Sequence, residues 1–142
     1  MPLPVSMVAK ASLSEQALVL LDAPKKDIKE LSLAVESAAK LTNICPVLIT
    51  VLMYTESTFK KDAISSKGYK GLMQTDWATM KWADVDTLYG VKMLTEKLEY
   101  SKGDLHLAIA LYKGGNNNAS KNFADATLKL YSSIKLKCKN GN

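Results

Sequence analysis

Residues 46–57, PVLITVLMYTES, decide the fold class, because this stretch is apolar on nearly every side. Pro46 suits the first turn of a helix, where a backbone N–H has no partner inside the helix. The Val, Ile, Thr and Tyr content alone would also allow a strand. The neighbouring segments have helical periodicity and the stretch has the length of a helix, so we predict a buried central helix.

The segments on either side predict further helices. Ser12 and Glu15 have the spacing of a capping box, which begins a short helix that continues to Asp22. We expect the remaining helices at about residues 25–41, 77–82, 84–100, 105–113 and 119–136. The polar segment 58–71 predicts a loop, and a minimal β-hairpin between Thr58 and Gln74 is the largest β-structure that it allows. The predicted fold class is therefore all-α.

Length and composition limit the function classes. The 142 residues, 47% of them hydrophobic, suit one compact domain that spans residues 1–142. No run of about 18 apolar residues occurs, so we expect no membrane insertion. All 19 basic residues are Lys, against 14 acidic residues. Because Lys lacks the planar fork with which Arg contacts bases, we expect no sequence-specific binding of nucleic acid. The positive surface either attracts a polyanion such as a wall glycan or keeps the protein soluble.

Few residues that bind metals or activate nucleophiles are present. Cys45 and Cys138 lie far apart and outside any CxxC pair, and His106 is the single histidine. We therefore expect no metal site and no cofactor, and a role for His106 in helix packing. The two thiols either form a disulfide in an oxidising compartment or are unrelated. In a signal peptide a positively charged region precedes an apolar region, and the N-terminus does not follow this order. We therefore expect no export signal.

Glu56 is the first candidate for chemistry. It lies at the C-terminal end of the predicted buried helix. Burial and the negative end of the helix dipole both raise the pKa of a carboxyl group at such a place. A carboxylic acid that keeps its proton near neutral pH suits the general acid of glycoside cleavage. The alternative is a glutamate that ends the helix and faces solvent.

Three short motifs follow one another along the chain: Glu56-Ser57, Gly71-Leu72-Met73-Gln74 and the segment 110–115, ALYKGG. In this order and spacing they resemble the catalytic domain of the soluble lytic transglycosylases, a lysozyme-like family that cleaves peptidoglycan. The resemblance runs from about residue 33 to residue 134 and leaves residues 1–32 as an N-terminal helical extension. It implies a lysozyme-like, all-α fold with a substrate groove.

The resemblance also implies a role for each matching residue. Glu56 matches the single catalytic acid and base, and Ser57 the serine that positions the carboxyl group or the substrate. The residues that match groove-forming or sugar-contacting positions are Gly71, Met73, Gln74, Tyr112 and Tyr131. Tyr112 is expected to face Glu56, and Tyr131 to lie near the same site. From the residues alone, the preferred interpretation of both tyrosines is that they are core aromatics with hydrogen-bonded hydroxyl groups.

Two departures from the family pattern affect the site. Lys113 stands where the family has Asn, and a lysine there could bind a lactyl or peptide carboxylate of the substrate. Asp76 stands close to the Gly-Leu-Met-Gln motif and could act as a second carboxylate. Asp62 is the other candidate for that role, although both aspartates could be solvated loop or capping residues.

The predicted function is lytic transglycosylation of peptidoglycan, in which the bond between N-acetylmuramic acid and N-acetylglucosamine is cleaved and a 1,6-anhydro sugar forms. One alternative is a muramidase in which Asp76 or Asp62 orients water. The other is a catalytically impaired peptidoglycan-binding protein. We expect a monomer whose partner is the glycan strand of the cell wall. Two settings fit a substrate outside the cytoplasm: a phage protein, in the virion or released at lysis, or a bacterial enzyme of a secretion or conjugation apparatus.

Overall fold

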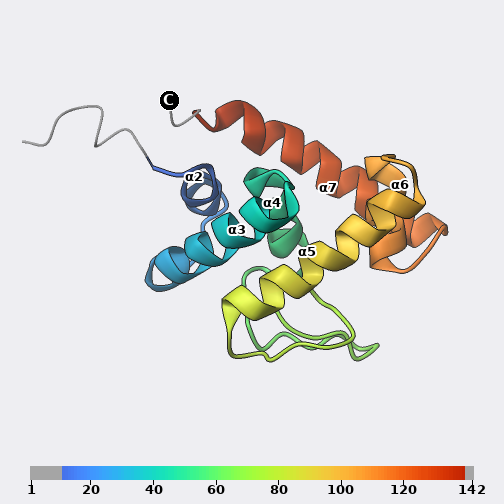
Figure 1. Ribbon diagram of the computed structural model, residues 1–142, viewed down its shortest axis with the longest axis horizontal. Helices are drawn as coiled ribbons and strands as arrows, with labels where there is room; N and C mark the ends of the chain where they lie inside the picture. The colour runs from blue at the N-terminus through green and yellow to red at the C-terminus, as the bar shows by residue number, and fades with distance from the viewer. Residues whose placement is uncertain (1–10, 140–142) are drawn as a thin grey trace, which may run out of the picture.

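Helix α4 (Pro46–Ser57) lies at the centre of the structure, and the other helices surround it (Figure 1). The structure is a computed structural model that describes residues 11–139. The remaining elements are α2 (Leu13–Leu20), the 3-10 helix η1 (Lys25–Asp27), α3 (Ile28–Thr42), α5 (Ala83–Tyr100), α6 (Leu105–Lys113) and α7 (Asn118–Lys137). The all-α prediction is confirmed. In place of a hairpin, two isolated bridges join Lys70 to Ile64 and to Thr75.

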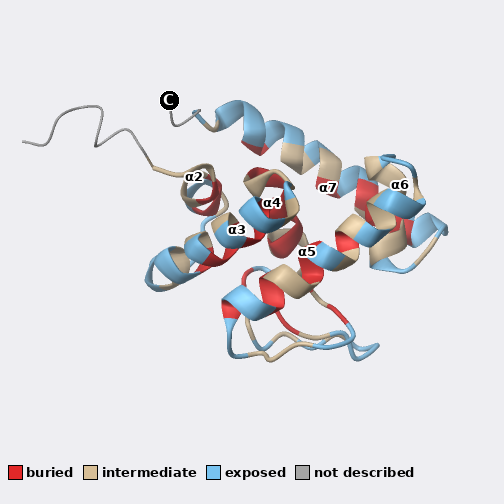
Figure 2. Cartoon of the chain, viewed as in Figure 1, coloured by how far each residue is buried: buried red, intermediate tan, exposed pale blue. Residues whose placement is uncertain are grey.

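The predicted burial of α4 is confirmed. Ile49, Val51, Leu52 and Met53 have no exposed surface, and each such side chain contributes about 1.5–3 kcal/mol when it leaves water. Pro46 occupies the first turn as expected. Buried residues of α3, α4 and α5 face one another in the interior (Figure 2). The carboxyl-terminal end of α4 is therefore held from several sides.

The end of α4 is set by two residues in the left-handed region. Thr58 has φ 50° and Phe59 has φ 66°, which turns the chain away from the helix directly after Ser57. The Phe59 ring is buried and lies 5.7 Å from the Tyr54 ring. The turn leaves Glu56 in the last turn of a buried helix, at the start of the loop 58–82 that passes below α5 in Figure 1.

Side-chain caps fix the flanking helices. The Ser12 hydroxyl accepts a hydrogen bond from the Glu15 N–H, and the Asp104 carboxylate accepts one from the Leu107 N–H. Both caps follow the sequence prediction. The C-terminal end of α7 lies beside α2, where the Gln16 side chain exchanges hydrogen bonds of 2.7 and 2.8 Å with the Lys139 backbone. The first and last described helices are thus joined.

The predicted short helix at residues 77–82 is wrong. This segment wraps around the buried Asp86 carboxylate, which accepts hydrogen bonds from the N–H groups of Thr79 (2.7 Å) and Met80 (2.9 Å). Met80 has φ 57°, outside the helical region. The Thr79 hydroxyl then accepts from the N–H groups of Lys81 and Trp82. Helix α5 begins only after this capping turn, at Ala83.

Three further expectations concern a membrane span, an export signal and the two thiols. None of the helices in the described part of the chain is long and apolar enough to cross a bilayer. The prediction about an export signal concerns the N-terminus, of which residues 1–10 lie outside the described residues. Cys45 and Cys138 are free thiols, and both pack against the same small apolar cluster of Ala17, Val47, Val51 and Ile134.

Candidate active site

The Glu56 carboxyl group is almost fully buried, although it belongs to the last turn of its helix. Its side chain is 1% exposed, and its Oε1 lies 2.9 Å from the Lys113 Nζ. Burial raises the pKa of Glu56, and the charge and hydrogen bond of Lys113 lower it by a smaller amount, so the pKa lies above its ordinary value. The solvent-facing alternative for Glu56 does not match the structure. Burial and the Lys113 cation thus have opposite effects on the pKa of the Glu56 carboxyl group.

Two adjoining hollows lie in front of Glu56. The first, of about 240 Å³, is lined by Glu56, Ser65, Ser66, Lys67, Tyr69, Gln74, Tyr112 and Lys113. The second, of about 480 Å³, shares Tyr69, Gln74 and Tyr112 with the first and extends along Asp76, Met93, Lys97, Leu111, Gly114 and Gly115. We call the two hollows together the groove. It runs between the loop 58–82 and helices α5 and α6.

Hydrogen bonds to backbone carbonyls hold the groove wall. Gln74 Nε2 donates to the carbonyls of Ala63 and Gly71, each at 3.0 Å. The Tyr112 hydroxyl, on α6, donates to the Met73 carbonyl at 2.6 Å. Of the three predicted site residues in the Gly-Leu-Met-Gln segment, Gly71 and Met73 are buried and Gln74 lines the groove. The backbone carbonyls of Gly71 and Met73 accept the hydrogen bonds that hold the wall.

Gly71 and Gly90 permit this close packing. At Gly71, φ is +79° and a Cβ would lie 2.9 Å from the Ala78 Cβ. At Gly90, in the middle of α5, a Cβ would lie 2.6 Å from the Met73 Cγ, closer still to the Met73 Cβ, and 3.1 Å from the Tyr112 hydroxyl. Real Cβ atoms do not approach so closely, so α5 can lie against the groove wall only because position 90 lacks a side chain.

Lys113 is the last residue of α6 and reaches back over the groove toward Glu56. Its side chain is 41% exposed, and its Nζ also lies 4.6 Å from the centre of the Phe123 ring on α7. Such a contact with an aromatic face is weakly attractive for a cation. The Lys113 ammonium is thus shared between a buried carboxyl group and an aromatic ring.

The structure does not bring every predicted residue to the groove. The Ser57 side chain is buried, and its hydroxyl donates to the Met53 carbonyl at 3.1 Å, away from any lining position. Tyr131 lies beside the Cys45 thiol, at the opposite end of α4 from Glu56, and its hydroxyl accepts from the Lys135 Nζ. The expectation that Tyr131 lies near Glu56 therefore needs correction. Thr127 on α7 faces Thr55, the neighbour of Glu56 on α4. Tyr131 lies one helical turn further along α7 and therefore further from Glu56.

The two candidate second carboxylates differ. Asp76 lines the second hollow but not the one that contains Glu56, and it accepts a 2.8 Å hydrogen bond from the Tyr89 hydroxyl. The Tyr89 ring in turn packs against Trp77, with ring centres 5.4 Å apart. Asp62 is exposed and lines neither hollow. Among the described residues, no second carboxyl group lines the Glu56 hollow.

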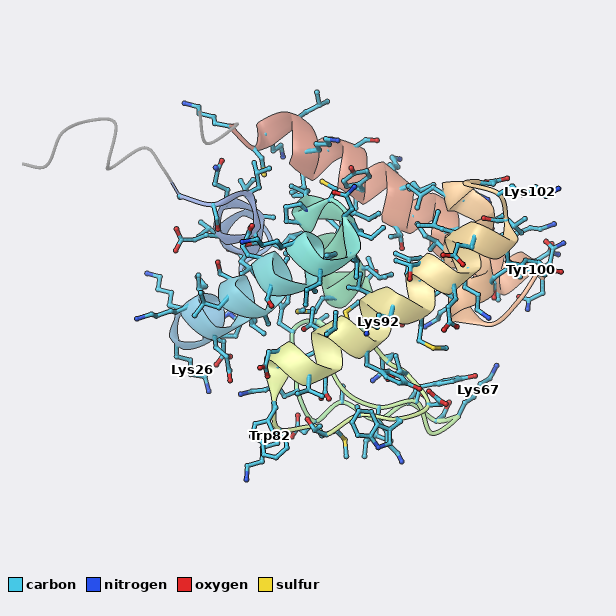
Figure 3. All side chains as sticks on the ribbon, in the orientation of Figure 1. Lys26, Lys67, Trp82, Lys92, Tyr100 and Lys102 are labelled. Carbon is cyan, nitrogen blue, oxygen red and sulfur yellow. The ribbon has the colours of Figure 1, made fainter. Side chains whose placement is uncertain are left out.

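Tyr69 was not identified from the sequence, although it lines both hollows. It belongs to the loop 58–82, whose polar composition indicated only a loop. Lys67, which also lines the Glu56 hollow, and Trp82 project from opposite ends of this loop region (Figure 3). An isolated aromatic residue between lysines and glycines was the one signal, and it carries little information without the fold.

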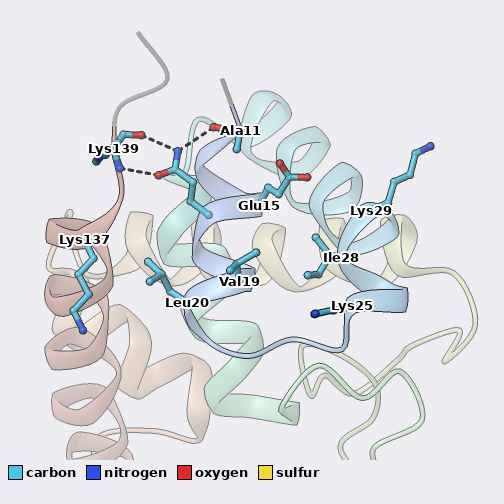
Figure 4. A pocket seen from close by; sticks show the side chains of 10 residues that line it. Ala11, Glu15, Val19, Leu20, Lys25, Ile28, Lys29, Lys137 and Lys139 are labelled. Atoms are coloured by element: carbon cyan, nitrogen blue, oxygen red, sulfur yellow. Dashed lines mark hydrogen bonds between the residues drawn. The ribbon is translucent and has the colours of Figure 1, made fainter. Parts of the chain in front are cut away.

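Two other features of the described surface are a hollow beside α2 and the pair of His106 and Asp125. A wider hollow than either part of the groove, of about 670 Å³, lies between α2, the start of α3 and the end of α7 (Figure 4). Val19, Leu20 and Ile28 line it together with four lysines, and among its described lining residues Glu15 is the one acid. His106 pairs with Asp125 on the surface, at 2.7 Å. The described residues contain no cluster of three potential metal ligands.

Comparison with known families adds a further finding. The family model described as "Transglycosylase SLT domain" matches residues 34–134. This segment runs from α3 to α7 and includes every residue that lines the groove. Helix α2 precedes the matched segment.

Proposed function

The chain belongs to the SLT transglycosylase domain family, and on this premise we propose that it cleaves the β-1,4 bond between N-acetylmuramic acid and N-acetylglucosamine. The family gives the fold as lysozyme-like and the general activity as lytic transglycosylation of peptidoglycan, a component of the cell wall. One observation carries the finer proposal. Glu56 is a buried carboxyl group and the one acid among the described residues that line its hollow.

In the first step Glu56 acts as the acid. Burial raises the pKa of this group, so its protonated form persists to a higher pH than that of an exposed glutamate. The carboxyl group donates its proton to the glycosidic oxygen as the bond from that oxygen to C1 of N-acetylmuramic acid breaks. N-acetylglucosamine leaves with the proton. Gln74 and Tyr69 line both hollows, and we expect them to contact sugars on either side of the bond.

In the second step the Glu56 carboxylate acts as the base. It removes the proton from the C6 hydroxyl of the same muramic acid residue while O6 bonds to C1. The product is a 1,6-anhydro sugar, no water is consumed, and Glu56 again carries its proton. Because the nucleophile belongs to the substrate, this route requires one carboxyl group at the bond.

The muramidase alternative needs a water and a second carboxyl group to orient it, typically about 6.5–9.5 Å from the first. Asp76 is the remaining candidate for that role, since Asp62 does not reach the groove. Asp76 belongs to the adjoining hollow and is already hydrogen-bonded to Tyr89. The arrangement therefore favours transglycosylation over hydrolysis.

The Lys113–Glu56 ion pair favours a second candidate function, a peptidoglycan-binding protein with impaired catalysis. An ammonium ion at 2.9 Å stabilises the carboxylate, which cannot donate a proton. In this alternative the groove still binds glycan strands, but the bond stays intact.

Mass spectrometry of the material released from purified peptidoglycan sacculi tests these functions. Transglycosylation gives fragments with anhydro ends, each lighter by one water than the reducing ends that hydrolysis gives. Glu56→Gln should abolish release while the protein stays folded. Reducing ends in place of anhydro ends would refute transglycosylation. No release, together with pelleting of the protein on sacculi, would indicate the binding protein.

A further inference from the structure

Most polar side chains around Glu56 are already engaged with backbone carbonyls. The hydroxyl of Ser57 donates to Met53, that of Tyr112 donates to Met73, and the Gln74 amide donates twice to the loop. Within the described residues, Lys113 is the one side chain that hydrogen-bonds Glu56. The charge state of this buried acid thus depends on one movable cation.

The two partners of the ion pair differ in freedom. Glu56 is 1% exposed on a buried helix, whereas Lys113 is 41% exposed at the end of α6. The chain continues from Lys113 into Gly114 and Gly115, and the Lys113 ammonium is held besides Glu56 only by a weak contact with the Phe123 ring among the described residues. Lys113 can therefore swing away from Glu56 by rotation of its own exposed side chain, while Glu56 stays in place.

Lys113 also faces the space where the substrate would bind, because it lines the same hollow as Gln74 and Tyr69. Peptidoglycan carries carboxylates near the cleaved bond, either on the lactyl group of a peptide-free muramic acid or on the peptide stem. A substrate carboxylate in the groove would compete with Glu56 for the ammonium. Glu56, left buried without a cation, would then be more stable in its protonated form.

We propose that Lys113 couples substrate recognition to the proton of Glu56: it holds the Glu56 carboxylate in the free protein and transfers to a carboxylate of the bound glycan, so that Glu56 takes up a proton from water and becomes the acid. This inference rests on the proposed function and makes Lys113 a positioning residue that determines specificity. The enzyme acts on glycan strands that carry a carboxylate next to the cleaved bond. Neutral strands of the same backbone leave the ion pair closed.

Other titratable groups around Glu56 are consistent with this role. Lys67 and Tyr69 from the loop, and Tyr112 from α6, line the hollow beside Lys113. Burial raises the pKa of Tyr112 well above its ordinary value, so this hydroxyl stays neutral while the ion pair opens. Lys67 is exposed at the groove edge and adds positive charge that attracts an anionic strand.

Three substrates with one backbone test the inference. Glycan strands freed from their peptides carry lactyl carboxylates, peptide-bearing strands carry carboxylates only on the stem, and peptide-free strands treated to form methylamides carry none. For wild type, we expect the methylamide strands to be cleaved about tenfold more slowly near neutral pH, the change that one unit in the acid's pKa produces. Their pH–rate profile should shift to lower pH. The order of the two charged substrates identifies which carboxylate binds.

Variants of Lys113 separate this role from a structural one. Lys113→Gln should cleave charged and methylamide strands at equal rates with one common pH profile, whereas Lys113→Arg should restore the preference for charged strands. Lys129→Gln, at an exposed position of α7, is the matched control. Circular dichroism establishes that each variant is folded.

Two results would overturn different conclusions. If wild type cleaves the charged and methylamide strands equally, or if Lys113→Gln keeps the preference, Lys113 does not control Glu56 and only this inference fails. If wild type cleaves none of the three substrates at any pH, the proposed function fails, and the inference falls with it.

Discussion

Gly90→Ala tests the packing that supports the groove wall. The new Cβ would lie 2.6 Å from the Met73 Cγ and 3.1 Å from the Tyr112 hydroxyl. Alanine favours a helix over glycine by about 1 kcal/mol, but overpacking costs about 1–3 kcal/mol. Loss of the 2.6 Å bond from Tyr112 to the Met73 carbonyl costs about 0.5–1.5 kcal/mol more. We expect a net loss of about 0.5–3.5 kcal/mol in the free energy of unfolding.

The same substitution should reduce activity. Because Tyr112 lines the Glu56 hollow, a displacement of about 1 Å in the groove wall can reduce kcat/KM by up to about 100-fold. Urea unfolding followed by circular dichroism measures the stability, and sacculus digestion measures the activity. Gly114→Ala is the stability control, since among the described residues its Cβ would meet only the Ser120 Oγ, at 3.4 Å. A Gly90→Ala protein that is as stable and as active as wild type would refute the packing argument.

Three further experiments address the electrostatics and the loop. The folded-state pKa of Glu56 lies above its unfolded value, so the stability from this group is present below the unfolded pKa and is lost as pH rises through the folded pKa. Because glutamine does not ionise, Glu56→Gln does not lose stability in this way, and its Tm should exceed that of wild type at neutral pH. The difference in Tm should disappear below about pH 4. An equal Tm of the two proteins across this range would contradict the burial argument. Asp86→Ala leaves the N–H groups of Thr79 and Met80 without their acceptor, so it should lower the free energy of unfolding in urea by about 1–3 kcal/mol. Asp86→Asn keeps one acceptor oxygen and should lower it less. Equal losses in the two variants would exclude this capping role. Salt that shortens the Debye length from about 10 Å to about 3 Å should release the protein from sacculi at unchanged Tm, if the lysine surface drives binding.

The helices and the burial of Glu56 could be predicted because their signals are local. Capping residues such as Ser12 and Asp104 act on N–H groups three residues away, and the apolar stretch of α4 is buried wherever it lies in the fold. The same locality explains the error at residues 77–82. Their conformation depends on Asp86, which lies beyond the segment and reaches back to it. Periodicity within the segment carries no information about that contact.

The groove was less predictable because distant segments form its wall. Gly90 permits the contact with Met73 and Tyr112, yet a glycine inside an amphipathic helix suggests only a weak point in that helix. Tyr131 was misplaced for a related reason. The resemblance aligned Tyr131 with the site. Which residues of α7 lie opposite the end of α4 depends on side-chain packing, such as that of Thr127 against Thr55.

The ion pair between Lys113 and Glu56 has opposite meanings for an impaired protein and for an enzyme, and the unequal burial of its two partners supports the enzyme that we propose. A permanent buried pair needs both charges desolvated and held, since each bears a cost that only the other offsets. Here the acid is 1% exposed and the lysine 41% exposed. Water can solvate the lysine when it leaves, and the buried acid can avoid an unpaired charge by taking a proton. Because of this asymmetry, the pair opens most readily when Lys113 leaves and Glu56 takes up a proton. A resting enzyme needs this property, whereas a permanently closed site does not.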